Sequence, residues 1–158
     1  RPVIDFLNKT FQTVPFEKCL SVDEQMCATK ARHYMKQYMP LKPHKWGYKL
    51  YVLSGVTGYA YQFEIYSGQE NSEKYRFPNE PDLGASANNV IRLCRSIPKN
   101  CNYIVYFDNY YTGIPLMSYL FSNGILSLGT VRRNRLPNCK FSSDTVLKKK
   151  REVLSKNM

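Results

Sequence analysis

Two aspartates that follow short apolar runs are the residues best suited to carry chemistry in this sequence. Asp23 comes after the run at residues 19–22, and Asp108 comes directly after the run at residues 103–107. If these runs are neighbouring parallel strands, both carboxylates lie at the same edge of the sheet, where ligand and metal sites of α/β proteins form. Carboxylate oxygens suit Mg²⁺ or Mn²⁺, and such ions clamp the attacking and leaving oxygens in phosphoryl transfer. The sequence therefore predicts half of a hard-cation site at Asp23 and Asp108.

Each of these acids also has a structural alternative. An aspartate at the end of a strand is more often a turn residue or a helix cap than a metal ligand, so spacing alone does not decide for a metal. Glu24 is either a group that supports Asp23 or a solvated neighbour, and the second interpretation is favoured. The aspartate pair is therefore a hypothesis that the rest of the sequence has to support.

The composition predicts a packed and strongly basic domain. The 158 residues are 43% hydrophobic and 14% aromatic, which disfavours a disordered chain. Lys and Arg number 23 against 12 Asp and Glu, and this net charge of +11 calls for a polyanionic partner. Nucleic acid is the first partner to consider, and no membrane partner is expected because the longest apolar runs are too short to cross a bilayer.

The cysteines indicate neither a disulfide framework nor a zinc site. The five cysteines are odd in number and form no Cys-x-x-Cys pair. Reduced, intracellular thiols are the simplest interpretation. No signal peptide is visible near the N-terminus, and a start at Arg1 in place of Met leads us to expect a fragment.

Two segments carry most of the positive charge. Residues 30–49, the basic arm, contain six Lys or Arg, two His and no acid, and Pro40 and Pro43 prevent a helix. Residues 132–158, the basic tail, hold nine Lys or Arg and two acids, which is +7 of the total charge. The cations expected to contact DNA phosphates are Lys30, Arg32, Lys36, Lys42, Lys45, Arg132, Arg133 and Arg135.

Other residues of these segments keep two or more interpretations. His33 and His44 are interpreted as surface residues or phosphate contacts, because no acid stands near them in the sequence. Trp46 beside Tyr48 either stacks a nucleobase or fills the core, and the core is favoured where a strand begins. The run at residues 148–151 is a solvated helix face, a nuclear-import signal or a phosphate patch.

The apolar pattern predicts the elements that must position the two aspartates. It predicts an opening helix that stops before Pro15, and two later helices at residues 85–97, with Ser86 as the cap, and 115–124. It predicts five strands, the second and third of them an antiparallel hairpin, at residues 19–22, 48–53, 59–66, 103–107 and 125–131. The predicted order is therefore β β β α β α β, an α/β domain over residues 1–131 followed by the basic tail.

Five strings stand in order along nearly the whole chain. They are SVDEQM at 21–26, KQYMPLKPHKWGYKL at 36–50, DLGAS at 82–86, FDNYYT at 107–112 and GTVRRNR at 129–135. Together they resemble the transposase domain of the piggyBac family of DNA transposons and their domesticated relatives. The resemblance implies an RNase H-like fold, in which a mixed five-stranded sheet with flanking helices places the first strand beside the fourth.

The same resemblance implies a function. Members of the family transpose DNA by cut and paste, with aspartates that bind Mg²⁺ or Mn²⁺ for strand cleavage and joining at TTAA targets. Asp23 matches the first catalytic aspartate and Asp108 the second, each within its own motif. The resemblance therefore implies DNA as the partner, metal-dependent strand transfer as the reaction and the nucleus as the location, and it is compatible with a homodimer.

The sequence departs from the family pattern towards its end. The family's third metal-binding aspartate lies in a segment rich in Gly-Gly-Val-Asp that this sequence does not contain, and only Asp144 and Glu152 follow Asp108. Ala31 stands where the family more often has Gly. The catalytic core is therefore expected to be incomplete, with residues 132–158 leading toward a missing insertion and third motif.

Three hypotheses follow from these patterns. The chain is a transposase fragment that keeps the fold and two metal ligands and is inactive alone, or it is a domesticated DNA-binding module whose aspartates are relics. The third hypothesis is an active nuclease in which Glu152 substitutes for the missing ligand. The absence of the third motif from this sequence argues against the nuclease.

Overall fold

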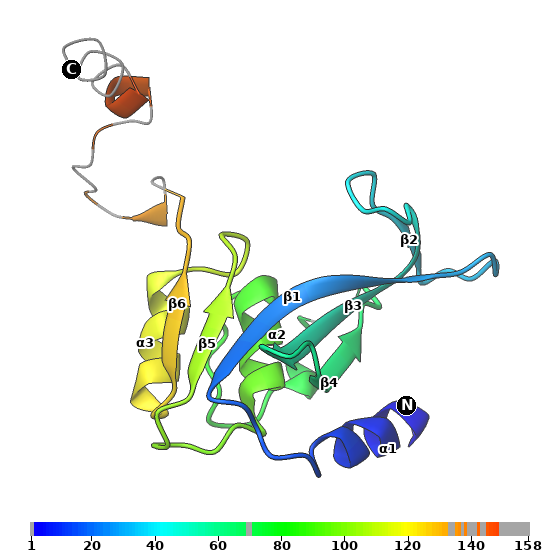
Figure 1. Ribbon diagram of the computed structural model, residues 1–158, viewed down its shortest axis with the longest axis horizontal. Coiled ribbons are helices and arrows are strands. Elements are labelled where there is room, and N and C mark those ends of the chain that lie inside the picture. Colours follow the sequence, from blue (N-terminus) through cyan, green and yellow to red (C-terminus); the bar gives the residue numbers. More distant parts are fainter. Residues whose placement is uncertain are drawn as a thin grey trace.

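The described residues fold into a mixed α/β structure around a sheet of six strands (Figure 1). The computed structural model describes residues 2–68, 71–132, 135–136, 138, 142 and 145–148. In chain order the elements are α1 (Pro2–Phe11), β1 (Cys19–Ala28), β2 (Lys36–Tyr38), β3 (Trp46–Gly55), β4 (Ala60–Ile65), the 3₁₀ helix η1 (Glu73–Tyr75), α2 (Ala85–Cys94), β5 (Ile104–Phe107), α3 (Ile114–Ser122) and β6 (Leu126–Gly129).

The strand pairing brings the two aspartate-bearing segments together. β1 pairs in parallel with β5, from Cys19 beside Ile104 to Val22 beside Phe107. β5 in turn pairs in parallel with β6, so β5 has a neighbour on each side. The expectation that the first strand and the strand ending at residue 107 are adjacent and parallel is confirmed.

β1 is longer than the sequence predicts, because its pairing with β3 continues far beyond its pairing with β5. The antiparallel register runs from Leu20 beside Gly55 to Ala28 beside Gly47. Asp23 therefore lies in the middle of a ten-residue strand and not at a strand end. The predicted hairpin between the second and third predicted strands is confirmed as the antiparallel pair β3 and β4.

The predicted strand count of five is wrong, since a sixth strand lies in the basic arm. β2 pairs with the first residues of β3, Lys36 beside Tyr48 and Tyr38 beside Trp46. This short strand rests on backbone hydrogen bonds at the sheet edge, and none of its three residues is fully buried. A strand that buries no side chain shows no apolar alternation, so the sequence pattern could not reveal it.

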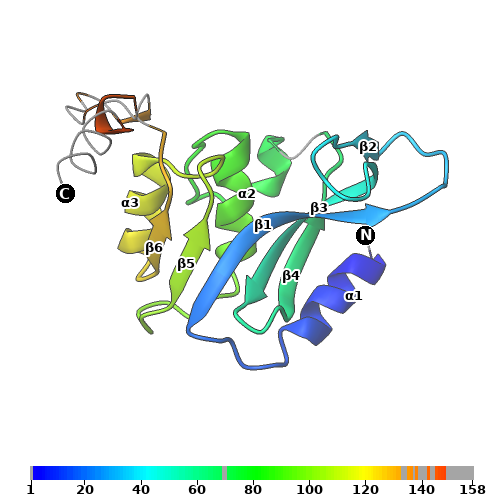
Figure 2. The same ribbon diagram turned by 45° about the horizontal axis from the view of Figure 1, so that its top comes forward.

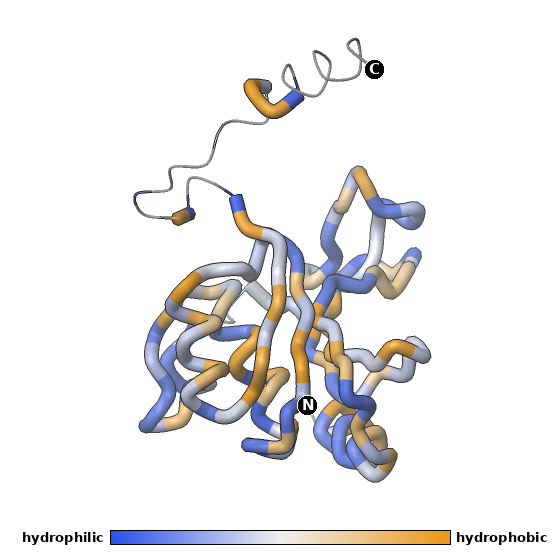
Figure 3. The backbone as a smooth tube through the Cα atoms, turned by 60° about the vertical axis from the view of Figure 1, so that its left-hand side comes forward, coloured by the Kyte–Doolittle hydropathy of each residue, from blue (hydrophilic) through white to orange (hydrophobic). Residues whose placement is uncertain are grey.

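The helices divide between the two faces of the sheet (Figure 2). α2 and α3 contact each other and cover the face to which β1 and β5 turn their buried residues. The core on this face includes Leu20, Val22, Val90, Leu93, Val105, Phe107, Leu116 and Leu120. α1 lies on the opposite face over β4, where the Asn8 Nδ2 donates to the Phe63 carbonyl at 3.0 Å. In Figure 3 the hydrophobic stretches run along the central strands, in keeping with this core.

α2 begins without the cap that the sequence predicts. Its N-cap position is Gly84, at φ 90°, and no side chain caps the helix. Ser86 lies inside the helix, so its prediction as a cap is wrong; the Asn88 Oδ1 instead accepts from the Leu83 N–H at 3.0 Å, just before the helix starts. The helix ends at Cys94 and not at residue 97. Among the described helices, none is long and apolar enough to cross a membrane.

Candidate active site

Asp23 and Asp108 occupy neighbouring positions on two adjacent parallel strands. The last pair of the register is Val22 beside Phe107, and the two aspartates are the next residues of their chains. Adjacent strands of a sheet lie about 4.8 Å apart, so the two backbones are close at this level. Both side chains are exposed, while Val22 and Phe107 before them are buried. The structure therefore brings the two predicted residues together at one end of β5.

The side chain of Asp23 lies on the face of the sheet opposite α2 and α3. In the register with β3, Asp23 stands beside Val52, and Val52 stands beside Phe63, which contacts α1. Since side chains alternate across a strand, Asp23 shares this face and Val22 the other. α1 covers the face only over β4, which leaves Asp23 accessible to solvent.

Asp108 is held in place by the turn that follows β5. Its Oδ1 accepts from the Tyr110 N–H at 2.8 Å, and its carbonyl oxygen accepts from the Thr112 N–H and hydroxyl at 3.1 and 2.7 Å. The close passage of β6 requires a glycine at Gly129, where a Cβ atom would lie 2.3 Å from the Thr112 Oγ1. The turn residue and metal ligand interpretations of Asp108 are thus compatible, because the turn orients the carboxylate.

An ion pair surrounded by aromatic rings joins β1, β3 and the turn after β5. The Lys49 Nζ lies 3.2 Å from the Glu24 Oε1. The same ammonium lies 4.8 Å from the ring centre of Tyr51 and 5.5 Å from that of Tyr110. Glu24 is therefore not the solvated neighbour that the sequence favoured, and Lys49 is a residue that sequence reasoning missed. The available signal was a single cation within the aromatic and apolar run of β3.

Tyr111 adds a buried hydroxyl to this cluster. Its side chain is 2% exposed, and its Oη has no hydrogen-bond partner among the described residues. Burial, together with the nearby carboxylates of Glu24 and Asp23, raises the pKa of Tyr111 well above its ordinary value. The phenol therefore stays neutral. The ammonium group of Lys49 is the group that balances the negative charge of Glu24.

Lys49→Met is expected to lower the free energy of unfolding by about 2 kcal/mol. The substitution leaves the largely buried Glu24 without its cation, and the loss falls below the roughly 3–5 kcal/mol of fully buried pairs because both side chains keep some solvent contact. Urea unfolding measures this loss of stability. The control is Lys9→Met on the exposed face of α1, which is expected to change stability by less than about 0.5 kcal/mol. Equal losses in the two variants would contradict this role of Lys49.

The predicted cations after β6 lie against the Asp108 turn. The Arg132 Nε donates to the Asn109 Oδ1 at 3.1 Å. The Arg135 Nη1 donates to the carbonyls of Asn109 and Tyr110 at 2.7 and 2.9 Å. Both arginines therefore bring positive charge close to Asp108, and their contact with DNA stays a prediction. Arg133 lies outside the described residues.

The predicted cations of the basic arm differ in their solvent exposure and in their contacts within the protein. Lys30, Arg32 and Lys45 are exposed. The Lys42 Nζ donates to the Glu24 carbonyl at 2.9 Å, which ties the arm to β1. The Lys36 Nζ lies 5.6 Å from the ring centre of Trp46. Figure 1 shows the arm projecting away from α2 and α3, so its free cations lie apart from the core.

Trp46 does not fill the core, so the interpretation that the sequence favoured is wrong. Its side chain is 55% exposed at the start of β3. It lines a groove of about 420 Å³ together with Thr29, Lys30 and Lys36. The aromatic residue therefore lies on the surface of the basic arm.

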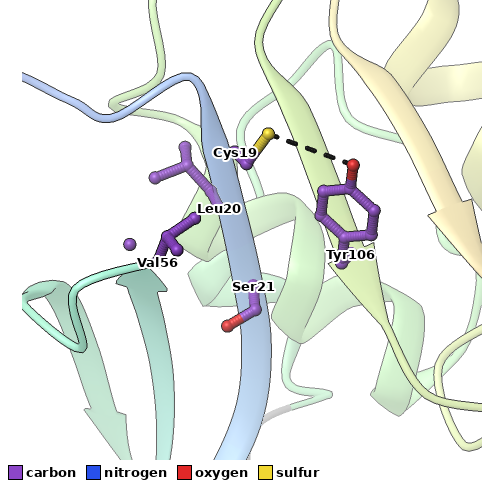
Figure 4. A pocket seen from close by; sticks show the side chains of 6 residues that line it. Cys19, Leu20, Ser21, Val56 and Tyr106 are labelled. Atoms are coloured by element: carbon purple, nitrogen blue, oxygen red, sulfur yellow. Dashed lines mark hydrogen bonds between the residues drawn. The ribbon is translucent and has the colours of Figure 1, made fainter.

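A second hollow lies at the first residues of β1. Its volume is about 320 Å³, and it is lined by Cys19, Leu20, Ser21, Gly55, Val56 and Tyr106 (Figure 4). The Cys19 thiol and the Tyr106 hydroxyl face each other across it at 4.0 Å. Ser21 and Tyr106 pair with each other two residues before Asp23 and Asp108, so the hollow lies on the same face of β1 and β5 as the two aspartates.

The donor set at Asp23 and Asp108 suits a hard divalent cation. Two exposed carboxylates side by side supply oxygen ligands and leave room for the waters that Mg²⁺ retains. Within the described part of the chain, no group of three or more His, Cys, Asp or Glu side chains gathers to hold a metal. The chemistry of the donor set therefore suits two protein ligands to such an ion, with the remaining positions left to water or substrate.

Comparisons with known proteins identify a transposase family and two relatives of this chain. The family described as Transposase IS4 matches residues 1–157. The human piggyBac transposable element-derived protein 3 is 32% identical over 153 residues, which is 95% of this chain and 25% of that protein. The human piggyBac transposable element-derived protein 2 is 32% identical over 152 residues, covering 94% of this chain and 25% of that protein. This chain thus spans about a quarter of the length of these relatives.

A solved structure shows the likeness in three dimensions. It is the cryo-EM structure of a piggyBac transposase synaptic complex with hairpin DNA, which superposes with a TM-score of 0.68 at 25% sequence identity. The match covers 94% of this chain and 29% of the solved one. The α/β arrangement described above is therefore similar to part of a transposase.

Proposed function

This chain belongs to the piggyBac-type transposase family, and we propose that it is a transposase domain that binds DNA and holds a divalent cation between Asp23 and Asp108. The observation that carries the proposal is the parallel register of β1 and β5, which ends one residue before each aspartate. The similarity to a transposase in complex with DNA supports the choice of partner. An RNase H-like fold is part of the proposal, supported by the mixed sheet with helices on both faces.

In this proposal Mg²⁺ or Mn²⁺ supplies Lewis-acid chemistry on a DNA phosphate. Asp23 and Asp108 hold the ion through their carboxylate oxygens, and the Tyr110 N–H keeps the Asp108 carboxylate oriented. Arg132 and Arg135 lie on the turn beside this carboxylate and offer positive charge to an approaching phosphate. Arg132 and Arg135 bind and orient the DNA strand next to the two aspartates.

The DNA contact is proposed to spread from the site onto the basic arm and the basic tail. Lys30, Arg32 and Lys45 are exposed and carry no neighbouring acid in the sequence. The family resemblance adds three further proposals: TTAA as the target, the nucleus as the location, and a homodimer as the assembly. The domain boundary at residue 131 likewise stays a proposal. Arg132 and Arg135 of the tail bind the turn after β5.

We propose that this chain alone does not cut DNA, because its sequence lacks the family's third metal-binding motif. Asp144 and Glu152, the candidates for a substitute ligand, lie outside the described residues. The second candidate function is a domesticated DNA-binding module. The exposure of the arm cations away from the aspartates favours it, since that surface can bind phosphates without any metal.

Asp23→Asn and Asp108→Asn are each expected to lower the affinity for Mn²⁺ by about tenfold or more. Each change removes one of two charged ligands, and even the loss of an outer-shell partner costs metal affinity on that scale. Electron paramagnetic resonance of free Mn²⁺ in a titration measures the affinity. The matched control is Asp5→Asn on α1, an exposed aspartate far from the pair, which is expected to leave the affinity unchanged.

The free energy of unfolding of the variants distinguishes a metal ligand from a residue that only stabilises the fold. Asp23 is exposed and has a like charge beside it, so Asp23→Asn is expected to change the free energy of unfolding by less than about 0.5 kcal/mol. Mn²⁺ affinity that is identical in all three variants would contradict the metal site and leave the DNA-binding module as the better account.

A further inference from the structure

An exposed aromatic pair lies where the basic arm joins the sheet. Tyr38, the last residue of β2, stands directly beside Trp46, the first residue of β3. Their ring centres are 4.8 Å apart, and the rings are tilted by 45°. The two side chains are 50% and 55% exposed. Aromatic residues usually bury most of their area, so this surface leaves a large apolar area in water unless a ligand covers it.

Positive groups flank this pair. The Lys36 Nζ lies 5.6 Å from the centre of the Trp46 ring. Lys30 and Thr29 complete the walls of the groove of about 420 Å³ beside Trp46. This volume is within the range of small-ligand pockets, and one nucleotide is a ligand of that scale. No acid occurs between residues 30 and 49, so the surroundings favour an anion.

The backbone beside Trp46 is fixed by the close approach of β3 to β1. A Cβ atom at Gly47 would lie 2.3 Å from the Cys27 carbonyl oxygen, so only glycine fits there. The next residues of β3 continue the register with β1, from Tyr48 beside Cys27 onward. The aromatic pair therefore stands on a defined strand, and its ring faces are presented in a fixed place.

The chemistry of this surface distinguishes an unpaired nucleotide from a base pair. In a duplex the faces of the bases are stacked on each other, so an indole ring on the protein surface finds only base edges and phosphates. In an unpaired strand each base offers a free face that stacks on an aromatic ring, and the adjacent phosphates bind nearby ammonium groups. A stacking ring with two flanking lysines matches the second case.

We propose that Tyr38, Trp46, Lys30 and Lys36 form a binding site for an unpaired segment of DNA. A base stacks on Trp46 and Tyr38, and the phosphates beside it contact the ammonium groups of Lys30 and Lys36. This proposal rests on the DNA-binding part of the proposed function and adds a preference among DNA forms. The duplex is held by the cations of the arm and tail, and the aromatic pair engages only where the strands are separated.

The test uses Trp46 as its own reporter, because it is the single tryptophan of the chain. The fluorescence of the 158-residue protein is followed while oligothymidine of about twelve nucleotides is added, and in parallel a blunt duplex of the same length. Oligothymidine is expected to quench Trp46 strongly, and the duplex is expected to bind with little quenching. Absence of quenching by oligothymidine at saturation would overturn the proposal.

Variants locate the site. Trp46→Ala is expected to weaken oligothymidine binding about tenfold, as measured by fluorescence anisotropy of labelled DNA, and to change duplex affinity less than about twofold. Trp46→Phe keeps a stacking face and is expected to restore most of the loss. The matched control is Tyr34→Ala, since Tyr34 is an 82% exposed aromatic of the same arm outside the groove. Equal weakening for duplex and oligothymidine in Trp46→Ala would overturn the proposal, and circular dichroism shows that the variants are folded.

The outcomes separate this proposal from the proposed function. If duplex binds with strong salt dependence and oligothymidine leaves Trp46 unaffected, this site is refuted and the proposed function stands. If neither DNA form binds, the DNA-binding part of the proposed function fails and this proposal with it. Oligouridine that binds more tightly than oligothymidine through Trp46 would replace the assignment to DNA by one to RNA.

Discussion

Raising the salt concentration from about 50 to 200 mM is expected to weaken the binding of this chain to duplex DNA by about 150-fold. The expectation assumes that about four phosphates are neutralised, each of which contributes about −0.9 to the slope of log affinity against log salt, for a slope near roughly −3.6. The structure offers a matching set of exposed cations: Lys30, Arg32, Lys45 and Arg132. Lys42 and Lys36 are less exposed and are not counted for the duplex, since Lys42 donates to the Glu24 carbonyl and Lys36 is assigned to the site at Trp46.

Charge removal at matched positions tests which cations bind. A triple variant with alanine at Lys30, Arg32 and Lys45 is expected to flatten the slope to about −1, because three of the four contacts are lost. The control carries alanine at Lys9, Lys18 and Lys99, which removes the same charge from exposed positions elsewhere. Fluorescence anisotropy at several salt concentrations gives both slopes. Identical slopes in the two triple variants would show that net charge and not the arm determines binding.

The tail can be tested without disturbing the Asp108 turn. Deletion of residues 143–158 removes five Lys or Arg and two acids while keeping Arg132 and Arg135 on the turn. If the tail adds phosphate contacts, the deletion is expected to flatten the slope further. An affinity that does not depend on salt would contradict this electrostatic account, and an unchanged slope after the deletion would confine the phosphate contacts to the arm and the turn after β5.

The elements with a buried face were predictable from sequence, and the strand at the edge was not. The apolar run that became β5 and the hairpin of β3 and β4 bury side chains, and burial leaves an apolar pattern in the sequence. β2 buries none and pairs through its backbone, so it left no such pattern. Asp23 was expected at a strand end because the apolar run stops before it, but pairing with β3 extends β1 to Ala28.

The placement of the two aspartates on adjacent strands was predictable, and the ion pair of Glu24 and Lys49 near them was not. Asp23 and Asp108 follow apolar runs, and such runs become adjacent strands in many α/β folds. Lys49 is distant in sequence from both acids and looks like a solvated cation within a strand. Only the register of β1 and β3 shows that it faces the same side as Glu24. Trp46 was assigned to the core because it stands where a strand begins, but the strand pairs there with the edge strand β2 and leaves the side chain 55% exposed.

The purified 158-residue chain with Mn²⁺ is expected to leave DNA with TTAA-flanked transposon ends uncut. Two-metal catalysis needs enough carboxylate oxygens to hold both ions, and Mg²⁺ enforces near-ideal octahedral geometry because it loses its waters reluctantly. Asp23 and Asp108 supply ligands that suit one ion, and no third carboxylate joins them among the described residues. Removing one member of a catalytic group that acts as a unit costs on the order of 10⁴ in rate, which would put cleavage at background.

The cleavage assay can refute this expectation in a specific way. The chain is incubated with Mn²⁺ and the DNA beside Asp23→Asn and Asp108→Asn, and an active member of the family on the same substrate shows that the DNA can be cut. Metal-dependent cleavage by the chain that disappears in both variants would establish an active nuclease. Glu152→Gln and Asp144→Asn would then identify the third ligand, because only the residue that completes the site would abolish cleavage while leaving the salt-dependent binding of DNA unchanged.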